Sequence, residues 1–136
     1  MGKRQFVLDF EEIHARRAEE FQVFVNGRLT LGENLADLNG LRIAYAAFER
    51  SLAGKPRPPL IDGFTPEQRF FLGWAQIWRE KYRDAYARLM VGTNPHSPPR
   101  WRVDGPLSNM TEFAQAFGCR ADDEMVRADS VRPRIW

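Results

Sequence analysis

The strongest constraint on the fold is a helical spacing of apolar residues in the first half of the chain. Between residues 31 and 52 these residues recur every three or four positions, at Leu31, Leu35, Leu38, Leu41, Tyr45, Phe48 and Leu52. This period places them on one face of an α-helix. Thr30 and Glu33 stand three apart at the expected start, the spacing of a capping box, and Gly54 lies at the expected end. The sequence therefore predicts one long amphipathic helix.

A second long helix is expected after the Pro- and Gly-rich residues 54–64. Thr65, Pro66 and Gln68 fit the cap, the first and the third helical position. Apolar residues then recur at helical spacing, at Phe70, Trp74, Ile77, Trp78, Tyr82, Ala85 and Leu89. This pattern predicts a single buried helix that continues to about Met90.

Shorter elements complete a mainly α-helical reading of one domain over residues 1–136. Residues 6–21 read as a charged helix, and the pair Asn26-Gly27 predicts a turn, because both residues tolerate positive φ. Residues 108–119 read as a short helix capped by Ser108. A chain of 136 residues with 43% hydrophobic residues has the size and composition of one domain.

Charge and cysteine content exclude some classes of protein. The 20 basic and 18 acidic residues give a net charge of +2, and the arginines are scattered, which argues against a nucleic-acid binder. One cysteine, Cys119, excludes an intrachain disulfide but leaves the compartment open. No apolar run approaches the roughly 20 residues that cross a bilayer, and the N-terminal residues lack the apolar core of a signal peptide.

Several catalytic signatures are missing from the sequence. The two histidines, His14 and His96, stand 82 positions apart, so the chain contains no H-E-x-x-H pair. It also has no G-x-S-x-G elbow, no Walker loop, no dinucleotide glycine fingerprint and no C-x-x-C pair.

Two acidic residues, Glu33 and Asp37, form the first candidate site. Four positions apart on a helix, they share a face and repel each other unless positive charge lies nearby. Glu33 is a candidate metal ligand, and Asp37 a candidate acceptor for the free N–H of a metal-bound histidine. The alternative is structural, since acids are favoured at a helix start and Glu33 completes a capping box with Thr30. The spacing alone favours this alternative.

The segment NPHSPPRWR supplies the second candidate site. His96 and Arg102 are expected on a proline-stiffened loop, where one side chain can hydrogen-bond an oxyanion and the other can hold a substrate carbonyl. The alternative is an ordinary surface loop with a partly solvated imidazole, and the segment taken alone favours that alternative.

The order of these motifs resembles the C-terminal part of the neprilysin family of zinc metallopeptidases. The resemblance is carried by GENLAD, the aromatic segment FFLGWAQIW, the His-Ser-Pro loop with an arginine six residues after the histidine, and the terminal RIW. It is clearest over residues 25–136. It implies a mainly α fold, the incomplete C-terminal helical portion of a thermolysin-like zincin catalytic domain. It also implies hydrolysis of peptide bonds in short peptides, in a parent family whose members include extracytoplasmic enzymes.

The resemblance implies a role for each candidate residue. Glu33 matches the third zinc ligand, and Asp37 matches the aspartate that hydrogen-bonds a zinc-ligating histidine. His96 matches the histidine that stabilises the oxyanion, and Arg102 matches the arginine that binds a substrate carbonyl. Zinc is therefore the implied cofactor and a short peptide the implied substrate.

Ile77 and Trp78 match the apolar residues that line the specificity pocket of the family, although helical spacing equally allows simple core packing. Two departures stand beside these matches. The zinc-binding H-E-x-x-H helix is missing upstream of GENLAD, and Asn94 stands where many relatives have an acidic residue. Because stable sites use three protein ligands or more, we expect this chain alone to bind zinc poorly and to cleave nothing.

The alternative function is a non-catalytic helical module that binds a peptide or a partner. It rests on the expectation that four aromatic residues are exposed, at Phe70, Phe71, Trp74 and Trp78. A homo-oligomer, or a second polypeptide that carries H-E-x-x-H, would cover such a face. In the chain alone, we also expect Glu33 to be free to cap Thr30.

Overall fold

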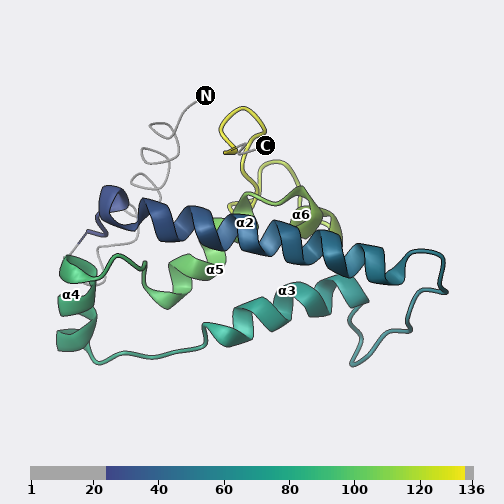
Figure 1. Cartoon of the computed structure of the whole chain (residues 1–136), viewed down its shortest axis with the longest axis horizontal. Helices are drawn as coiled ribbons and strands as arrows, with labels where there is room; N and C mark the ends of the chain where they lie inside the picture. The colour runs from purple at the N-terminus through teal and green to yellow at the C-terminus, as the bar shows by residue number, and fades with distance from the viewer. Residues whose placement is uncertain (1–23, 134–136) are drawn as a thin grey trace.

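The computed structural model describes residues 24–133, which form a helical structure (Figure 1). Its elements are α2 (Gly27–Leu52), α3 (Pro66–Ile77), α4 (Asp84–Thr93), α5 (Pro99–Ser108) and α6 (Thr111–Phe117). Over these residues there is no β-strand, only an isolated bridge between Ile61 and Phe64. The predicted mainly α fold is confirmed, while the helix expected over residues 6–21 lies outside the described residues.

Helix α2 is the predicted amphipathic helix, but it starts earlier than expected. Asn26 is its N-cap, and its side-chain oxygen accepts hydrogen bonds from the backbone N–H groups of Arg28 and Leu29. The predictions of a turn at Asn26-Gly27 and of a cap at Thr30 are therefore wrong. Asparagine is among the best N-caps, because its short side chain reaches the free amides of the first turn. Thr30 instead lies inside the helix and is buried.

Helix α3 begins as predicted. The Thr65 side chain accepts from the Gln68 backbone N–H, and the Gln68 side chain accepts from the Thr65 N–H, which completes a capping box. The Gln68 amide also donates to the carbonyl of Ala116 over 2.9 Å. This hydrogen bond ties the start of α3 to α6.

The single long helix predicted over residues 65–90 is wrong, because α3 ends at Ile77 and α4 begins only at Asp84. Trp78 leaves the helical path at φ −95° and ψ 13°, and its ring lies under the Arg102 guanidinium, 3.8 Å from ring centroid to Cζ. This contact between distant residues decides where the helix ends, although the helical spacing of apolar residues continues beyond it. Helix α4 carries no buried residue, so the prediction of a buried helix is also wrong there.

Helix α5 lies in a stretch that the sequence predicted as a loop. It starts with Pro99 at its first position, which suits proline because the N–H it lacks would have no helical partner there. Arg102 is therefore on a helix, not on a loop. Ser108 ends α5 and donates to the Gly105 carbonyl, so the prediction that it caps the next helix is wrong; the N-cap of α6 is Met110.

The core lies where α2, α3, α5 and α6 meet. Its buried members are Leu38, Leu41, Phe71, Leu107 and Met110. Burial of each such side chain contributes about 1.5–3 kcal/mol. Phe71 is only 1% exposed, and the Tyr45 ring stacks on it at 5.1 Å between centroids. The expectation of an exposed Phe71 is therefore wrong, and the other three aromatics expected at the surface are half-buried.

A guanidinium on α2 fastens the end of the described chain to this core. Arg42 donates to the carbonyls of Asn109 and Pro133, each over 3.1 Å. Its burial lowers the pKa of Arg42 from the ordinary value. Among residues 24–133, no helix combines the length and the apolar character that a bilayer crossing demands.

Candidate functional site

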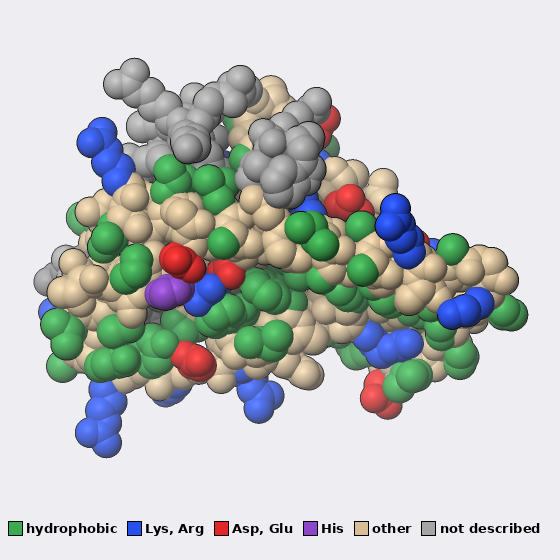
Figure 2. Space-filling view, in the orientation of Figure 1, with side chains coloured by type: hydrophobic (Ala, Val, Ile, Leu, Met, Phe, Trp, Pro, Cys, Tyr) green, Lys and Arg blue, Asp and Glu red, His purple; other side chains and the backbone are tan. Residues whose placement is uncertain are grey.

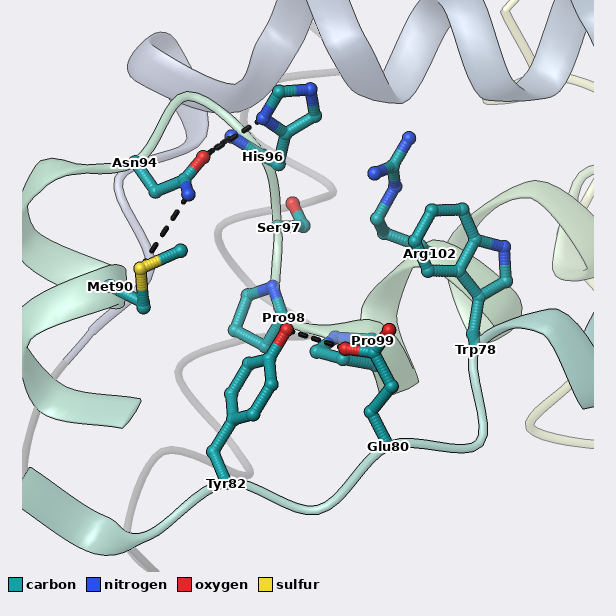
Figure 3. A pocket seen from close by; sticks show the side chains of 10 residues that line it. All are labelled: Trp78, Glu80, Tyr82, Met90, Asn94, His96, Ser97, Pro98, Pro99 and Arg102. Atoms are coloured by element: carbon teal, nitrogen blue, oxygen red, sulfur yellow. Dashed lines mark hydrogen bonds between the residues drawn. The ribbon is translucent and has the colours of Figure 1, made fainter. Parts of the chain in front are cut away.

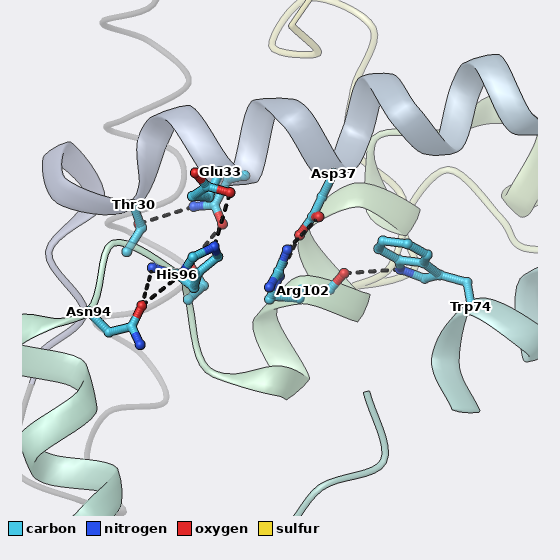
Figure 4. A network of polar contacts seen from close by, with 9 residues as sticks. Thr30, Glu33, Asp37, Trp74, Asn94, His96 and Arg102 are labelled. Carbon is cyan, nitrogen blue, oxygen red and sulfur yellow. Dashed lines mark hydrogen bonds and ion pairs between the residues drawn. The ribbon is translucent and has the colours of Figure 1, made fainter. Parts of the chain in front are cut away.

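The candidate residues gather where the first half of α2 faces the Asn94–Pro98 segment and α5. In Figure 2, acidic and basic side chains surround one histidine on a face that is otherwise rich in hydrophobic side chains. The close-up in Figure 4 shows Glu33 and Asp37 extending from one side of α2 toward His96 and Arg102. Four residues predicted from two distant segments are thus brought together. The positive charge expected near the two acids comes from protein side chains.

Asp37 and Arg102 form a bidentate ion pair. The Nε and Nη2 groups of Arg102 donate to the two carboxylate oxygens of Asp37, each over 2.7 Å. Their side chains are 15% and 10% exposed, so water screens the pair little. A carboxylate offers about four lone-pair positions, and this pair uses two. Asp37 therefore keeps lone pairs that can accept a hydrogen bond from another group.

The backbone of Arg102 is fixed by a hydrogen bond that a proline makes possible. In a regular helix the carbonyl of Arg102 would accept from the N–H of residue 106, but Pro106 has no N–H. The indole N–H of Trp74 donates to this carbonyl instead, over 3.0 Å. Helix α3 thereby holds the turn of α5 that carries Arg102, while Trp78 lies against its guanidinium.

His96 is held from both ring nitrogens. The Asn94 side-chain oxygen accepts from the His96 backbone N–H over 2.8 Å and lies 2.9 Å from Nδ1. An amide oxygen only accepts, so Nδ1 carries the proton of this contact. Nε2 lies 3.1 Å from the Glu33 carboxylate, a contact that is a hydrogen bond when Nε2 is also protonated. The imidazole is thus aimed at the solvent-accessible edge of α2, since both side chains are 43% exposed.

Glu33 does not cap the helix. Its carboxylate contacts His96, and the Thr30 backbone N–H donates to the carbonyl of Asn26. The expectation that Glu33 would be free to cap Thr30 is therefore wrong. The reason is that α2 starts one turn earlier, which places Thr30 and Glu33 beyond the free amides.

A buried polar chain that sequence reasoning missed connects the two segments. Ser97 donates to the Asn34 side-chain oxygen over 2.8 Å, and the Asn34 amide donates to the Thr30 hydroxyl over 3.1 Å. All three residues are at most 4% exposed. Asn34 follows Glu33 and Ser97 follows His96, so this chain fixes both neighbours. The available signal was a polar residue directly beside each candidate, with Thr30 and Asn34 four apart on the helix.

A pocket of about 210 Å³ opens beside Arg102 and His96 (Figure 3). Trp78 lines it, and its role in substrate binding stays a prediction. Ile77 does not line it and is 64% exposed at the end of α3. Glu80 and Tyr82, which sequence reasoning missed, form its lower wall in Figure 3, and no pattern in the sequence marked them.

The donor groups fit part of a zinc site. Glu33 offers a half-exposed carboxylate, a ligand type that zinc accepts. Within the described part of the chain, no three His, Cys, Asp or Glu side chains lie together as metal ligands would. The residues present therefore fit one zinc ligand and its surroundings, and the other ligands have to come from outside these residues.

Comparison with known proteins gives a consistent result. A sequence model of peptidase family M13 matches residues 2–132. The chain is 43% identical over 103 residues to an endothelin-converting enzyme homolog of Locusta migratoria, covering 74% of this chain and 14% of that protein. It is 41% identical over 114 residues to neprilysin of Homo sapiens, covering 82% of this chain and 15% of that protein.

Similarity to a solved structure extends over almost the whole chain. The zinc metalloprotease Zmp1 of Mycobacterium tuberculosis, solved with an inhibitor, superposes with a TM-score of 0.87 at 40% identity. The match covers 98% of this chain and 20% of that one. The chain therefore spans about one seventh to one fifth of the length of these relatives.

Proposed function

Because the chain belongs to peptidase family M13, we propose that it forms the C-terminal part of the active site of a zinc metalloendopeptidase that hydrolyses short peptides. The observation that carries this proposal is the convergence of Glu33, Asp37, His96 and Arg102 at one edge of α2. Two segments that lie about 60 residues apart supply these side chains, as the pairs of Asp37 with Arg102 and Asn34 with Ser97 show. The family resemblance and the geometry thus support the same four residues.

In this proposal each side chain has a distinct task. Glu33 is a zinc ligand, and Asp37 uses its remaining lone pairs to accept from the N–H of a zinc-ligating histidine, which orients that ring. The bound metal would polarise the scissile carbonyl and activate a water. Arg102, anchored by Asp37, holds a substrate carbonyl through its remaining N–H groups.

His96 is the proposed oxyanion stabiliser. Its Nδ1–H contact with Asn94 fixes the ring, and in the imidazolium form Nε2–H donates as well, toward negative charge that develops near Glu33. Preorganised donors of this kind are typically worth about 2.7–4 kcal/mol of transition-state stabilisation. A metal ion held by Glu33 would compete with His96 for that carboxylate and would leave Nε2–H available to a developing oxyanion.

The proposed site is incomplete in these 136 residues. Since they contain no H-E-x-x-H pair, we propose that this chain alone binds zinc weakly and is inactive. The two missing histidines and the glutamate that activates the water must come from a connected or separate polypeptide. Trp78 in the pocket, and Ile77 outside it at the end of α3, are the proposed substrate-side apolar residues.

Complementation tests the proposal. The chain is mixed with a polypeptide that carries the H-E-x-x-H portion of an M13 enzyme and with zinc, and cleavage of a quenched fluorescent peptide is measured. We expect activity in the mixture and its loss with Glu33→Ala. Asp122→Ala, at an exposed position, is the matched control and should leave activity unchanged. Absence of cleavage in every mixture would contradict the proposal.

A second candidate function is a non-catalytic helical module that binds a partner helix. The outward side of α2 favours it, because small residues are exposed there at one-turn intervals, at Gly32, Ala36, Gly40, Ala44 and Ala47. Side chains this small allow a second helix to approach closely. Large apolar residues are exposed as well, with Ile43 at 59% and Leu60 at 62%.

Sedimentation and a peptide titration separate the two candidates. The partner-binding function predicts either self-association of the chain or saturable binding of an apolar helical peptide, with or without zinc. A strict monomer that binds no peptide would rule it out. An enzyme restored by complementation would support the first candidate.

A further inference from the structure

We propose that the pocket beside Arg102 binds a cationic side chain of the peptide substrate, arginine or lysine, with Glu80 as its counter-charge. This inference rests on the proposed peptidase function. The pocket lies between the connection from α3 to α4 and the segment that carries His96 (Figure 3). A substrate held by Arg102 therefore has this pocket directly beside it.

The balance of charges in the pocket favours a cation. Its two basic lining groups already face carboxylates: Arg102 donates twice to Asp37 over 2.7 Å, and His96 Nε2 lies 3.1 Å from Glu33. Of the described residues, Tyr82 is the one shown to bond Glu80, through a neutral hydroxyl that donates over 2.6 Å. The charge left for a ligand is therefore negative and belongs to Glu80. An anionic ligand would meet that carboxylate, while the charge of Arg102 is already balanced by Asp37.

The hydrogen bond from Tyr82 prepares Glu80 for this role. It engages Oε2 of the carboxylate and leaves Oε1 for a ligand. The same bond, together with burial, raises the pKa of Tyr82 to about 12, so the phenol keeps its proton and stays a donor at neutral pH. The ring of Tyr82 also packs edge-on against Tyr86 at 5.1 Å between centroids, which limits its movement.

The other walls suit the alkyl part of a long side chain. Trp78, Met90, Pro98 and Pro99 contribute apolar surface, while Glu80 and Tyr82 form one end. Arginine and lysine bury their methylene stems on apolar surface and keep the charged group near polar atoms. Apolar walls with one carboxylate among them match that requirement.

An isosteric pair of probes tests the inference on the full chain. N-acetyl-arginine amide and N-acetyl-citrulline amide differ in charge but hardly in shape. Binding is followed by NMR through the Trp78 indole and Tyr82 ring signals. We expect the arginine probe to bind about fivefold more tightly, since a partly exposed ion pair is worth up to about 1 kcal/mol. Equal affinities, or absence of saturable binding of the arginine probe, would overturn the inference.

The variant Glu80→Gln tests whether the preference for the arginine probe depends on the Glu80 carboxylate. It should abolish the difference between the two probes and leave the affinity of the citrulline probe unchanged. Asp122→Asn changes the net charge equally at an exposed site and should keep the arginine preference. Circular dichroism checks that both variants fold. A preference that survives Glu80→Gln would contradict the inference.

The outcomes for the pocket and for the peptidase are separable. If the chain prefers the arginine probe but the complementation assay shows no cleavage, the pocket assignment is supported and the peptidase function is contradicted. Cleavage without any preference for a basic residue next to the scissile bond would keep the peptidase and reject the pocket assignment.

Discussion

The candidate site has two walls that are built in different ways. We call the first the anchored wall: α2, residues 94–98 and α5. The second, the open wall, is residues 78–93, the connection after α3 together with α4. The anchored wall contains the buried polar chain through Asn34 and the Asp37–Arg102 pair, whereas α4 in the open wall has no buried residue.

This difference separates two requirements of a peptidase site. Groups that act in the reaction must be held in a fixed geometry, and buried hydrogen bonds hold them there. Residues that make such bonds tolerate few substitutions, because an unpaired buried polar group is destabilising. Residues that select a substrate side chain need only a shaped and charged surface. The anchored wall carries the proposed reaction groups, and the open wall carries Glu80 and Tyr82. Apart from Trp78, which packs against Arg102, the open wall is therefore free to vary without loss of the fold.

A matched pair of leucine substitutions gives the largest expected contrast. Leu38 in the anchored wall is 1% exposed, and Leu89 in the open wall is 59% exposed. Leu38→Ala should lower the free energy of unfolding by roughly 3–5 kcal/mol through lost burial and a cavity. Leu89→Ala should change it by no more than about 0.5 kcal/mol. Urea denaturation measures both, and similar losses would show that the two walls are equally packed.

Removal of one partner of the buried ion pair should have the next largest effect. Asp37→Leu leaves the Arg102 charge without its carboxylate in a site that is mostly shielded from water. We expect a loss of about 3 kcal/mol in the free energy of unfolding. The control is Asp122→Leu in an exposed pair with Arg120, which should cost at most about 1 kcal/mol. Equal losses would mean that Asp37 and Arg102 behave as a surface pair.

The buried polar chain can be tested through its non-additivity. Asn34→Leu leaves the Ser97 hydroxyl without its acceptor, and Ser97→Ala leaves the Asn34 oxygen without its donor. Each single change should cost about 1–3 kcal/mol, while the double variant should cost less than the sum. A denaturation cycle over the four proteins measures the coupling. Strict additivity would indicate that the two side chains act independently.

The smallest expected effect is a pH dependence in the open wall. The folded-state pKa of Tyr82 is raised to about 12 from the ordinary 10.0, so the folded state holds this proton more tightly than the unfolded state. Its contribution to stability is complete below pH 10 and is lost as pH rises toward 12. Thermal melts across this range should show Tyr82→Phe losing less stability than the parent.

Tyr45 supplies an internal reference for that measurement. Burial raises its pKa to about 12 as well, and its ring lies in the core against Phe71. The decline that remains in Tyr82→Phe should therefore become smaller in a variant that also carries Tyr45→Phe. Identical slopes in the parent and in Tyr82→Phe would contradict the raised pKa of Tyr82.

Patterns within one element were predictable from the sequence, and contacts between elements were not. The helical spacing of apolar residues predicted α2, and the capping box predicted the start of α3. Both patterns depend only on neighbours within a few residues. The end of α3 was not predictable, since the period continues past Ile77 and the helix stops where Trp78 meets Arg102. That contact joins residues 24 positions apart, and no local pattern encodes it.

The candidate site shows the same division. Glu33, Asp37, His96 and Arg102 were candidates from their spacing and chemistry, and the family resemblance supplied a role for each. The pairing of Asp37 with Arg102 was not expected, and their proposed roles stay predictions. Asn34 and Ser97 were missed because their hydrogen bond forms only when the segment before α5 packs against α2, and no local pattern indicates that contact. Glu80 was missed because its importance arises only from the pocket that surrounds it.

In α2, the residue that starts the helix is different from the residues that are proposed to act in the site. Asn26 starts the helix, while Glu33, almost two turns later, has its contact with His96 instead of a capping amide. Single substitutions at position 33 should therefore remove or restore the proposed metal ligand while the scaffold keeps folding. Over evolutionary time, such a segment can outlive its original activity and be recruited again, because inheritance of the shape does not depend on the reaction.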